Sequence, residues 1–322
     1  MGGVVALGEC MVELSLAGPG STGADKAAIG YAGDVFNTCV YLRRLGREVS
    51  FATAVGADDP FSAAILARMG AEGIGDSLVT RVEGRVPGLY AIERDADGER
   101  RFFYWRDQAP VRQFFQIADL DGFIAAARAA ELFYVSGITL AVIGEAGRAA
   151  LSEILADLAR HDVPVAFDPN YRARLWPSRE VALAAVEAVI PHCRIVSASG
   201  PDVEALCQAP LDETARRWAA KGPLVLARAE DRQVDVHGAR SVLTLPAPPA
   251  AKATDTTGAG DSFNAGFLAA WLKGAEPTVA VEAGHTLAAQ VVQHIGAIIP
   301  LEAMPQRQPP GAFSGPGVSE AP

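Results

Sequence analysis

A short segment after residue 250 places three small residues directly before an aspartate. It reads "KATDTTGAGDSFNAGFLAAW", and the small residues are Gly258, Ala259 and Gly260. Small residues at a helix start let a ligand approach the free backbone N–H groups, which together with the helix dipole attract phosphate. A carboxylate at Asp261 would repel that anion unless it served the chemistry. The productive role is a general base, which takes a proton from a hydroxyl as it attacks a phosphoryl group.

The helix after this turn is predicted from apolar spacing. Phe263, Phe267 and Trp271 recur every fourth residue and define one buried stripe. The alternative interpretation of Asp261 is structural, because an acidic residue in the first turn stabilises the helix dipole while glycines merely turn the chain. These four residues alone leave both interpretations open.

Short apolar and β-branched runs alternate with helical patterns along most of the chain. The clearest strands are expected at 4–7, 49–55, 132–136, 163–167, 194–197 and 224–227. The clearest helices are expected at 34–45, 60–69, 146–160 and 179–189. Asp59 before Pro60 is the expected N-cap of the second helix. The alternation predicts an α/β fold, with a mostly parallel central sheet flanked by helices on both faces and ligands beyond the carboxyl ends of its strands.

One region departs from this alternation. "LYAIERDADGERRFFYWR", at 89–106, consists of two strand-like runs around an Asp-Gly pair, a strong hairpin signal. Side-chain alternation places Phe102, Tyr104 and Arg106 on one face of the second run. A hairpin with an aromatic and arginine face and no helix of its own is expected to form part of a small β-sheet lid. The alternative is that these aromatic side chains simply pack on the main domain.

The bulk composition narrows the class of protein. The chain has 322 residues, of which 50% are hydrophobic, and its net charge of −10 argues against a general nucleic-acid binder. No run of about eighteen apolar residues occurs, and the N-terminus lacks a basic region, so neither a membrane span nor a signal peptide is expected. The four cysteines lack CxxC spacing and the five histidines form no ligand-spaced pair. We expect a cytoplasmic protein without a dedicated metal site.

Two other nucleotide-binding motifs are missing from the sequence. No GxxxxGK[ST] segment occurs, which excludes a P-loop site. Gly2, Gly3 and Gly8 do not make GxGxxG, which disfavours a Rossmann oxidoreductase despite the α/β pattern.

Two segments together resemble the signatures of the ribokinase-like carbohydrate kinases. "DTTGAGDSFNAGF" is similar to the C-terminal signature, and "GYAGDVFNTCVYLRRLG", at 30–46, to the N-terminal glycine signature. Both occur in the family's order and separation, which is far more specific than either alone. The resemblance implies a ribokinase-like fold with a β lid and a homo-oligomer, and it favours the base interpretation of Asp261.

Four further stretches resemble the bacterial 2-keto-3-deoxygluconate kinases within that family. They are "GECMVELS", "PGLYAIERDADGERRFFYWR", "FDPNYRARLW" and "GAIIPLEAMP". The resemblance implies that ATP phosphorylates the 6-hydroxyl of 2-keto-3-deoxygluconate, giving the 6-phosphate and ADP, with Mg²⁺ arriving bound to ATP. We expect one kinase domain over 1–305, a lid formed in part by 10–33 and 86–107, and a disordered Pro/Gly-rich tail at 306–322.

The resemblance implies a site that contacts both ends of this substrate. Residues implied to contact its carboxylate and keto end are Tyr90, Tyr104, Arg106 and Arg172. Residues implied to contact its hydroxyls are Gly33, Asp34 and Asn37. Arginine can hold a carboxylate with two hydrogen bonds, and tyrosine hydroxyls can meet keto oxygens. Asp34 could instead cap its helix or hold both roles, and Arg174 is as easily a surface or structural arginine as a ligand.

The nucleotide side departs from the family pattern. The N–H groups around Gly258, Ala259 and Gly260 are expected to stabilise charge on the transferred phosphate. The candidate nucleotide contacts are Ser199, Asp202, Arg228, Gly258 and Gly260. Ser199 and Asp202 stand where the family has Asn-x-x-Glu, and they could order metal-bound water. Residues 229–231, Ala-Glu-Asp, add negative charge where a glycine turn is usual. Arg228 could alternatively be a helix-surface arginine.

Other functions stay open at this point. A kinase for keto-deoxy-galactonate, fructose or ribose would use the same fold, and a non-catalytic sugar-acid sensor could retain it. A neutral sugar would leave Arg106 and Arg172 without a carboxylate partner, whereas the galactonate epimer differs in one hydroxyl only. The intact Asp261 and its glycines disfavour the sensor.

Overall fold

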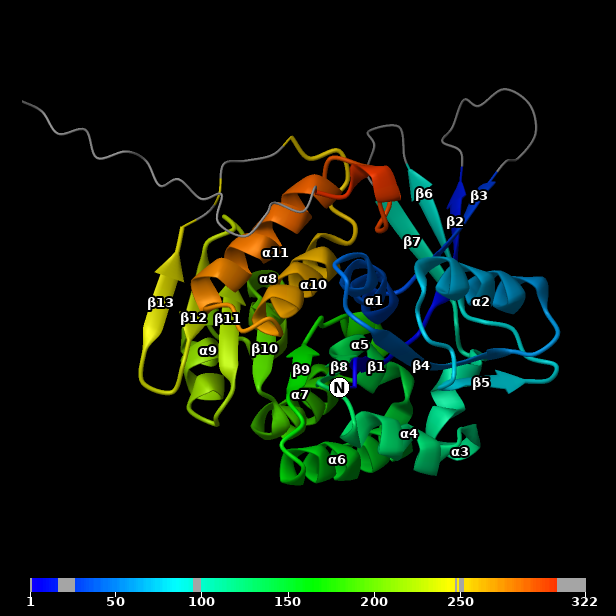
Figure 1. Cartoon of the computed structure of the whole chain (residues 1–322), viewed down its shortest axis with the longest axis horizontal. Helices are drawn as coiled ribbons and strands as arrows, with labels where there is room; N and C mark the ends of the chain where they lie inside the picture. Colours follow the sequence, from blue (N-terminus) through cyan, green and yellow to red (C-terminus); the bar gives the residue numbers. More distant parts are fainter. Residues whose placement is uncertain (1, 17–26, 95–99, 247, 249–251, 306–322) are drawn as a thin grey trace, which may run out of the picture.

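The structure is a computed structural model, shown in Figure 1, and it describes residues 2–16, 27–94, 100–246, 248 and 252–305. The Asp-Gly turn expected within the hairpin and the tail expected to be disordered lie outside these residues.

A central sheet forms the framework of the molecule. Its strands are β1 (Val4–Leu7), β4 (Val49–Gly56), β5 (Val79–Val82), β8 (Leu132–Ser136), β9 (Val165–Asp168), β10 (Ile195–Ser199), β11 (Leu224–Arg228), β12 (Val234–His237) and β13 (Val242–Leu245). They run in the order β13-β12-β11-β10-β9-β8-β1-β4-β5. All neighbours from β11 to β5 are parallel, whereas β12 pairs antiparallel with both β11 and β13. The six predicted strands and their parallel arrangement are therefore confirmed.

Helices cover both faces of this sheet. They are α1 (Asp34–Arg44), α2 (Pro60–Glu72), α3 (Phe114–Ile117), α4 (Leu120–Arg128), α5 (Gly137–Val142), α6 (Gly144–Arg160), α7 (Arg179–Val189), α8 (Gly200–Cys207), α9 (Leu211–Ala219), α10 (Ala259–Trp271) and α11 (Pro277–Val291). Short 3₁₀ turns include η1 (Pro110–Gln113), η2 (Ala173–Leu175), η3 (Ile190–His192) and η4 (Leu301–Ala303). No helix in the described part of the chain is long and apolar enough to span a bilayer.

The two faces of the sheet have separate hydrophobic cores because side chains alternate along each strand. In β1, Val5 and Leu7 belong to one core and Val4 and Ala6 to the other. Residues of α4 to α9 pack in the first core, and residues of α1, α2, α10 and α11 pack in the second. Figure 1 shows α4 and α6 on the opposite side of the sheet from α10 and α11. Burial on both faces explains why these strands read as continuous apolar runs.

The predicted start of α2 illustrates how local sequence sets an element. The Asp59 carboxylate accepts hydrogen bonds from the N–H groups of Phe61 and Ser62, and Pro60 occupies the first helical position. The helix ends at Gly73, whose φ of 70° suits a left-handed C-cap. The predicted N-cap is confirmed.

A second, four-stranded sheet stands beside the main one, and we call it the lid sheet (Figure 1). Its strands are β2 (Met11–Leu16), β3 (Ala27–Ala32), β6 (Leu89–Arg94) and β7 (Arg100–Trp105), in the order β3-β2-β6-β7. The predicted hairpin is present as β6 and β7, which place Tyr90 opposite Tyr104. The parallel pairing of β2 with β6 joins this hairpin to the segment that follows β1. The N-terminal glycine signature, at 30–46, begins on β3 of this sheet and continues into α1.

Candidate active site

Two cavities meet at the N-terminus of α10. The first has a volume of about 740 Å³ and lies between the carboxyl ends of the central strands and the lid sheet. The second, of about 540 Å³, lies between α10, α11 and the turn after β11. Both cavities are lined by Ser199, Pro201, Arg228, Thr256, Ala259 and Gly260. The first turn of α10, together with the ends of β10 and β11, therefore forms the wall that the two cavities share.

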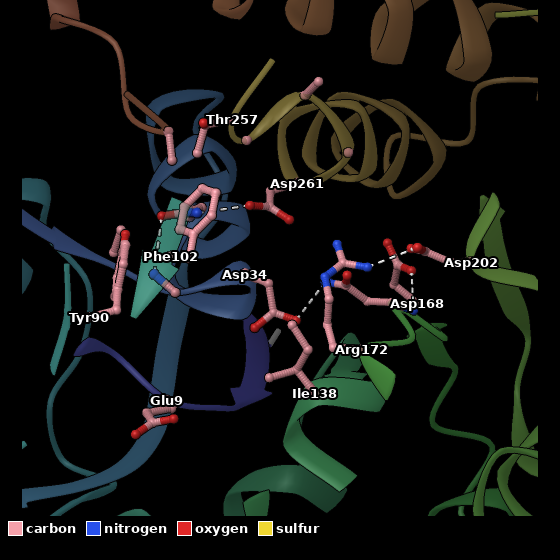
Figure 2. A pocket seen from close by; sticks show the side chains of 18 of the residues that line it. Glu9, Asp34, Tyr90, Phe102, Ile138, Asp168, Arg172, Asp202, Thr257 and Asp261 are labelled. Atoms are coloured by element: carbon pink, nitrogen blue, oxygen red, sulfur yellow. Dashed lines mark hydrogen bonds and ion pairs between the residues drawn. The ribbon is translucent and has the colours of Figure 1, made fainter. Parts of the chain in front are cut away.

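Asp261 lies in this first turn and lines the first cavity, where Figure 2 also shows Asp34 and Asp168. Its Oδ2 accepts a hydrogen bond of 2.8 Å from Nδ2 of Asn37. Burial raises the pKa of Asp261 to about 8, and the negative charges of Asp34 and Asp168 contribute to the rise. A carboxylate of this basicity is suited to take a proton from a hydroxyl near neutral pH.

Gly258 is the N-cap of α10 and has a φ of 76°. A Cβ at this position would lie 2.6 Å from the backbone oxygen of Ala297, so only glycine fits. The N–H of Ala259 donates to the backbone oxygen of Thr256 at 3.2 Å and is thus used within the turn. A Cβ at Gly260 would lie 3.2 Å from Nη1 of Arg228. Because Gly260 has no side chain, the Arg228 guanidinium can lie close to the N-terminus of α10. An anion bound there would be attracted by both the arginine and the helix dipole.

The start of α1 supplies the residues expected to contact sugar hydroxyls. Gly33, Asp34 and Asn37 all line the first cavity. The N-cap is Gly33, so the alternative in which Asp34 caps the helix is wrong. A Cβ on Gly33 would lie 2.0 Å from the backbone oxygen of Glu9, which requires glycine there. The Asn37 amide contacts Asp261, so it orients this carboxylate in addition to lining the cavity.

A chain of buried and partly buried hydrogen bonds links the two cavities. Nδ2 of Asn170 donates to Oδ2 of Asp34 at 2.9 Å, and its backbone N–H donates to Oδ1 of Asp168 at 2.9 Å. Oδ2 of Asp168 accepts from Arg228 at 3.2 Å and from Asn264 at 2.7 Å. Asp168 therefore connects an arginine that lines both cavities with a carboxylate of the first.

Two glutamates hold the donors on the lid side of the first cavity. The Tyr90 hydroxyl donates to the Glu13 carboxylate, and burial, together with the Glu13 charge, raises the pKa of Tyr90. Arg106 is buried and forms an ion pair with Glu9. Burial raises the pKa of Glu9, and Arg106 opposes the rise. The rings of Tyr90 and Tyr104 stack with centroids 5.6 Å apart.

The remaining sequence-predicted residues divide unequally between the cavities. Arg172 lines the first cavity, and its Nη1 donates to Oδ1 of Asp202 at 2.8 Å. Asp202, expected on the nucleotide side, is among the residues of the first cavity and not of the second. Ser199 lines both. Arg228 ends strand β11, so its interpretation as a helix-surface arginine is wrong.

Three further residues of the first cavity had no role assigned from the sequence, although the Asp-Pro-Asn segment at 168–170 was of interest because it follows a predicted strand. Asp168 ends strand β9, Glu9 and Asn170 lie two residues beyond the ends of β1 and β9, and all three line the cavity. Their position at carboxyl ends of parallel strands was the available signal. Arg174 also lines the cavity, and its Cζ lies 3.6 Å from the ring centroid of Tyr104.

The second cavity combines apolar side chains with charged ones. Apolar residues that line it include Val234, Phe263, Ala288, Ala289 and Val292. Glu230 lines it, as the sequence suggested, but Arg228 and Arg232 line it too. The negative charge of the unusual turn is therefore accompanied by two arginines. In the described residues, no group of three or more His, Cys, Asp and Glu side chains could hold a metal ion.

Comparison with known proteins agrees with this arrangement. Residues 1–304 match the family model described as pfkB family carbohydrate kinase. A 2-dehydro-3-deoxygluconokinase of Dickeya dadantii (strain 3937) is 38% identical over 312 residues, which span 94% of this chain and 98% of that protein. A protein of the same name from Escherichia coli (strain K12) is 36% identical over 311 residues, with 94% and 98% covered.

The fold also matches solved structures. The crystal structure of a PfkB protein from Polaromonas sp. JS666 superposes with a TM-score of 0.79 at 25% identity, covering 91% of this chain and 96% of that one. Family model, sequence relatives and fold all extend over nearly the whole chain. The chain belongs to the pfkB family of carbohydrate kinases.

Proposed function

We propose that this protein transfers the γ-phosphoryl group of ATP to the 6-hydroxyl of 2-keto-3-deoxygluconate, also called 2-dehydro-3-deoxygluconate. The products are 2-keto-3-deoxy-6-phosphogluconate and ADP. The observation that carries the proposal is the position of Asp261, in the helix turn that separates two cavities. Support for the substrate comes from relatives named for this activity, which are 36% and 38% identical to the chain.

The two cavities suit two different ligands. The first is lined by arginines, tyrosines and hydroxyl-binding side chains, which suits a polar sugar acid. The second pairs apolar residues with Arg228 and Arg232, which suits a nucleobase joined to phosphates. With the sugar acid in the first cavity and ATP in the second, the γ-phosphoryl group is transferred between them beside the N-terminus of α10.

The chain's own groups perform three tasks in this reaction. Asp261 takes the proton of the 6-hydroxyl while the oxygen of that hydroxyl forms a bond to the γ-phosphorus. The bond from that phosphorus to the bridging oxygen breaks, and ADP leaves with the electron pair. The first-turn N–H groups of α10 other than that of Ala259, together with the guanidinium of Arg228, stabilise the charge on the transferred group.

Magnesium would reach the site bound to ATP, whose phosphates and waters would be its main ligands. It would neutralise phosphate charge. Ser199, which lines both cavities, and Asp202 are the nearby side-chain oxygens suited to ordering its water. The lid sheet, through Tyr90, Phe102 and Tyr104, would cover the sugar acid and exclude water that competes as acceptor.

We further propose that the chain acts in the cytoplasm and self-associates through the outer face of the lid sheet. Ile29 and Trp105 on that sheet are 56% and 62% exposed, and large exposed apolar side chains favour association. Sedimentation of wild type and Trp105→Glu tests this assembly. A wild-type protein that sediments as a monomer at assay concentrations would contradict it.

The proposed activity is tested by an ADP-release assay with Mg-ATP. Acceptors are 2-keto-3-deoxygluconate, its galactonate epimer, gluconate, fructose and ribose. We expect turnover with 2-keto-3-deoxygluconate that Asp261→Asn lowers by about 10²- to 10⁴-fold. Asp76→Asn, on a carboxylate that is 56% exposed, is the matched control and should keep full activity. Preference for a neutral sugar or for the epimer would overturn the substrate assignment. No turnover with any acceptor would overturn the assignment as a kinase.

A further inference from the structure

Four arginines line the first cavity, and their charges are not equally available. They are Arg106, Arg172, Arg174 and Arg228. Three have carboxylate partners: Arg106 pairs with Glu9, Arg172 with Asp202 at 2.8 Å, and Arg228 with Asp168 at 3.2 Å. Among the described residues, Arg174 has no carboxylate within ion-pair distance. It is thus the arginine of this cavity whose charge is not locally balanced.

Arg174 is held in place by an aromatic ring instead. It belongs to η2, the 3₁₀ turn that follows β9, and its Cζ lies 3.6 Å from the ring centroid of Tyr104 on β7. A guanidinium stacked on a ring face keeps the N–H donors of its edge available for another partner. The stack also restricts a long side chain, so less rotamer freedom is lost when an anion binds. Tyr104 thereby aligns the charge at the edge of the cavity.

The charge balance determines which arginine attracts an added anion. A substrate carboxylate that approaches Arg106 or Arg172 also meets Glu9 or Asp202, whose repulsion offsets much of the attraction. At Arg174 no such repulsion arises from a paired carboxylate. We propose that Arg174, stacked on Tyr104, binds the substrate carboxylate and selects sugar acids over neutral sugars. This inference rests on the proposed function and assigns a specificity residue within it.

The test compares an acid and a neutral ligand in the same variants. Steady-state kinetics give KM and kcat for 2-keto-3-deoxygluconate, and competition gives the inhibition constant of fructose, the neutral probe. Arg174→Gln should raise KM for the acid about 10- to 100-fold, the size of a charge-assisted hydrogen bond, with a much smaller change in kcat. The inhibition constant of fructose should stay unchanged. Arg174→Lys, which keeps the charge but not the planar stack, should give an intermediate KM.

Ionic strength supplies a second readout that a packing role would not move. Added KCl should raise KM for the acid in the wild type and have much less effect in Arg174→Gln. Arg101→Gln is the matched control, since Arg101 also stacks on a ring of β7, that of Phe103 at 5.4 Å, but does not line the cavity. This control should keep the wild-type constants. Circular dichroism and thermal melting verify that each variant is folded.

Three outcomes would overturn the assignment. An unchanged KM for the acid in Arg174→Gln would remove any contact with the carboxylate. Equal losses for the acid and for fructose would indicate that Arg174 merely packs the lid sheet. An acid-selective loss in Arg172→Gln, without one in Arg174→Gln, would transfer the role to Arg172. Failure of the proposed function is distinguished from all of these, because the wild type would then not phosphorylate the acid.

Discussion

The side-chain amide of Asn37 donates a 2.8 Å hydrogen bond to Oδ2 of Asp261, across 224 positions of the sequence. A neighbouring contact reinforces it, since the Thr38 hydroxyl donates to the backbone oxygen of Asp261 at 3.3 Å. The start of α1 is thereby fixed against the first turn of α10. The two signature segments of the family act on one carboxylate, although each was expected to serve a different part of the substrate.

Asn37→Ala should move the pH dependence of turnover. The amide lowers the pKa of Asp261, so its loss should raise that pKa above about 8 and shift the rising limb of kcat/KM to higher pH. A shift of one unit would lower activity at pH 7 about tenfold. The pH–rate profile from 6 to 10 measures this. In an Asp261→Asn background the same substitution should have little further effect, and an unmoved limb in the single variant would contradict the coupling.

Asp261→Asn should stabilise the ligand-free protein in a pH-dependent way. Folded Asp261 keeps its proton up to about pH 8, whereas the unfolded group releases it near 3.8. Between these values the folded state binds more protons, so this group makes the free energy of unfolding fall as pH rises. The gain in Tm of the variant should therefore grow from pH 5 to 8 and level off above 8.

Thermal melts of the wild type, Asp261→Asn and Asp76→Asn across this range provide the measurement. The Asp76 carboxylate is 56% exposed and serves as the control for removing one negative charge from the surface. A Tm difference that is constant from pH 5 to 9, or a destabilised Asp261→Asn, would show that folding does not raise the pKa of this carboxyl group.

Gly258→Ala should lose both stability and activity. Comparison with a second glycine separates the two causes, which are the strain of a left-handed backbone and the contact of the new Cβ with neighbouring atoms. Gly258 and Gly274 have φ values of 76° and 80°, but only at Gly258 does a Cβ meet backbone atoms, 2.6 Å from an oxygen. Gly274→Ala should cost about 1 kcal/mol, the strain of the left-handed conformation. Gly258→Ala should cost about 3 kcal/mol or more and displace the N-terminus of α10. Urea unfolding and kcat are measured for both variants. Equal losses of stability and activity in the two would show that contact of the new Cβ with the backbone at position 258 has no effect of its own.

Local patterns in the sequence predicted those features of the fold that depend on neighbouring residues. The apolar runs of β1 and β9, the Asp59 cap and the β6–β7 hairpin each follow from a few adjacent residues. Strands β12 and β13 were missed because they pair antiparallel beside a parallel array, with β13 at the edge of the sheet. Their residue patterns do not distinguish them from an ordinary loop.

The site was less predictable because its contacts join distant segments. The family resemblance gave residue types for the cavity, but no local signal shows that Glu9 pairs with Arg106 or that Asp202 turns toward Arg172. Those pairings depend on how the lid sheet and the α8 N-terminus meet the carboxyl ends of the strands. The availability of Arg174 follows only after the partners of the other arginines are known.

Arg228→Gln should impair phosphoryl transfer more than binding of the sugar acid. Its guanidinium lies beside Gly260, lines both cavities and pairs with Asp168 at 3.2 Å. Loss of one preorganised donor to the transferred group typically lowers kcat about 10²- to 10³-fold. We expect such a fall in kcat and a higher KM for ATP, with KM for the sugar acid little changed. Arg228→Lys should recover part of the loss because it keeps the charge.

The control for this prediction is Arg216→Gln, on a side chain of α9 that is 66% exposed and pairs with Asp212. Because Arg228 also contacts the ring of Phe263, thermal melts must show that its variants remain folded at the assay temperature. A folded Arg228→Gln with wild-type kcat would mean that the arginine serves only to balance the charge of Asp168. The N–H groups of α10 would then be left as the chain's main stabilisers of the transferred phosphate.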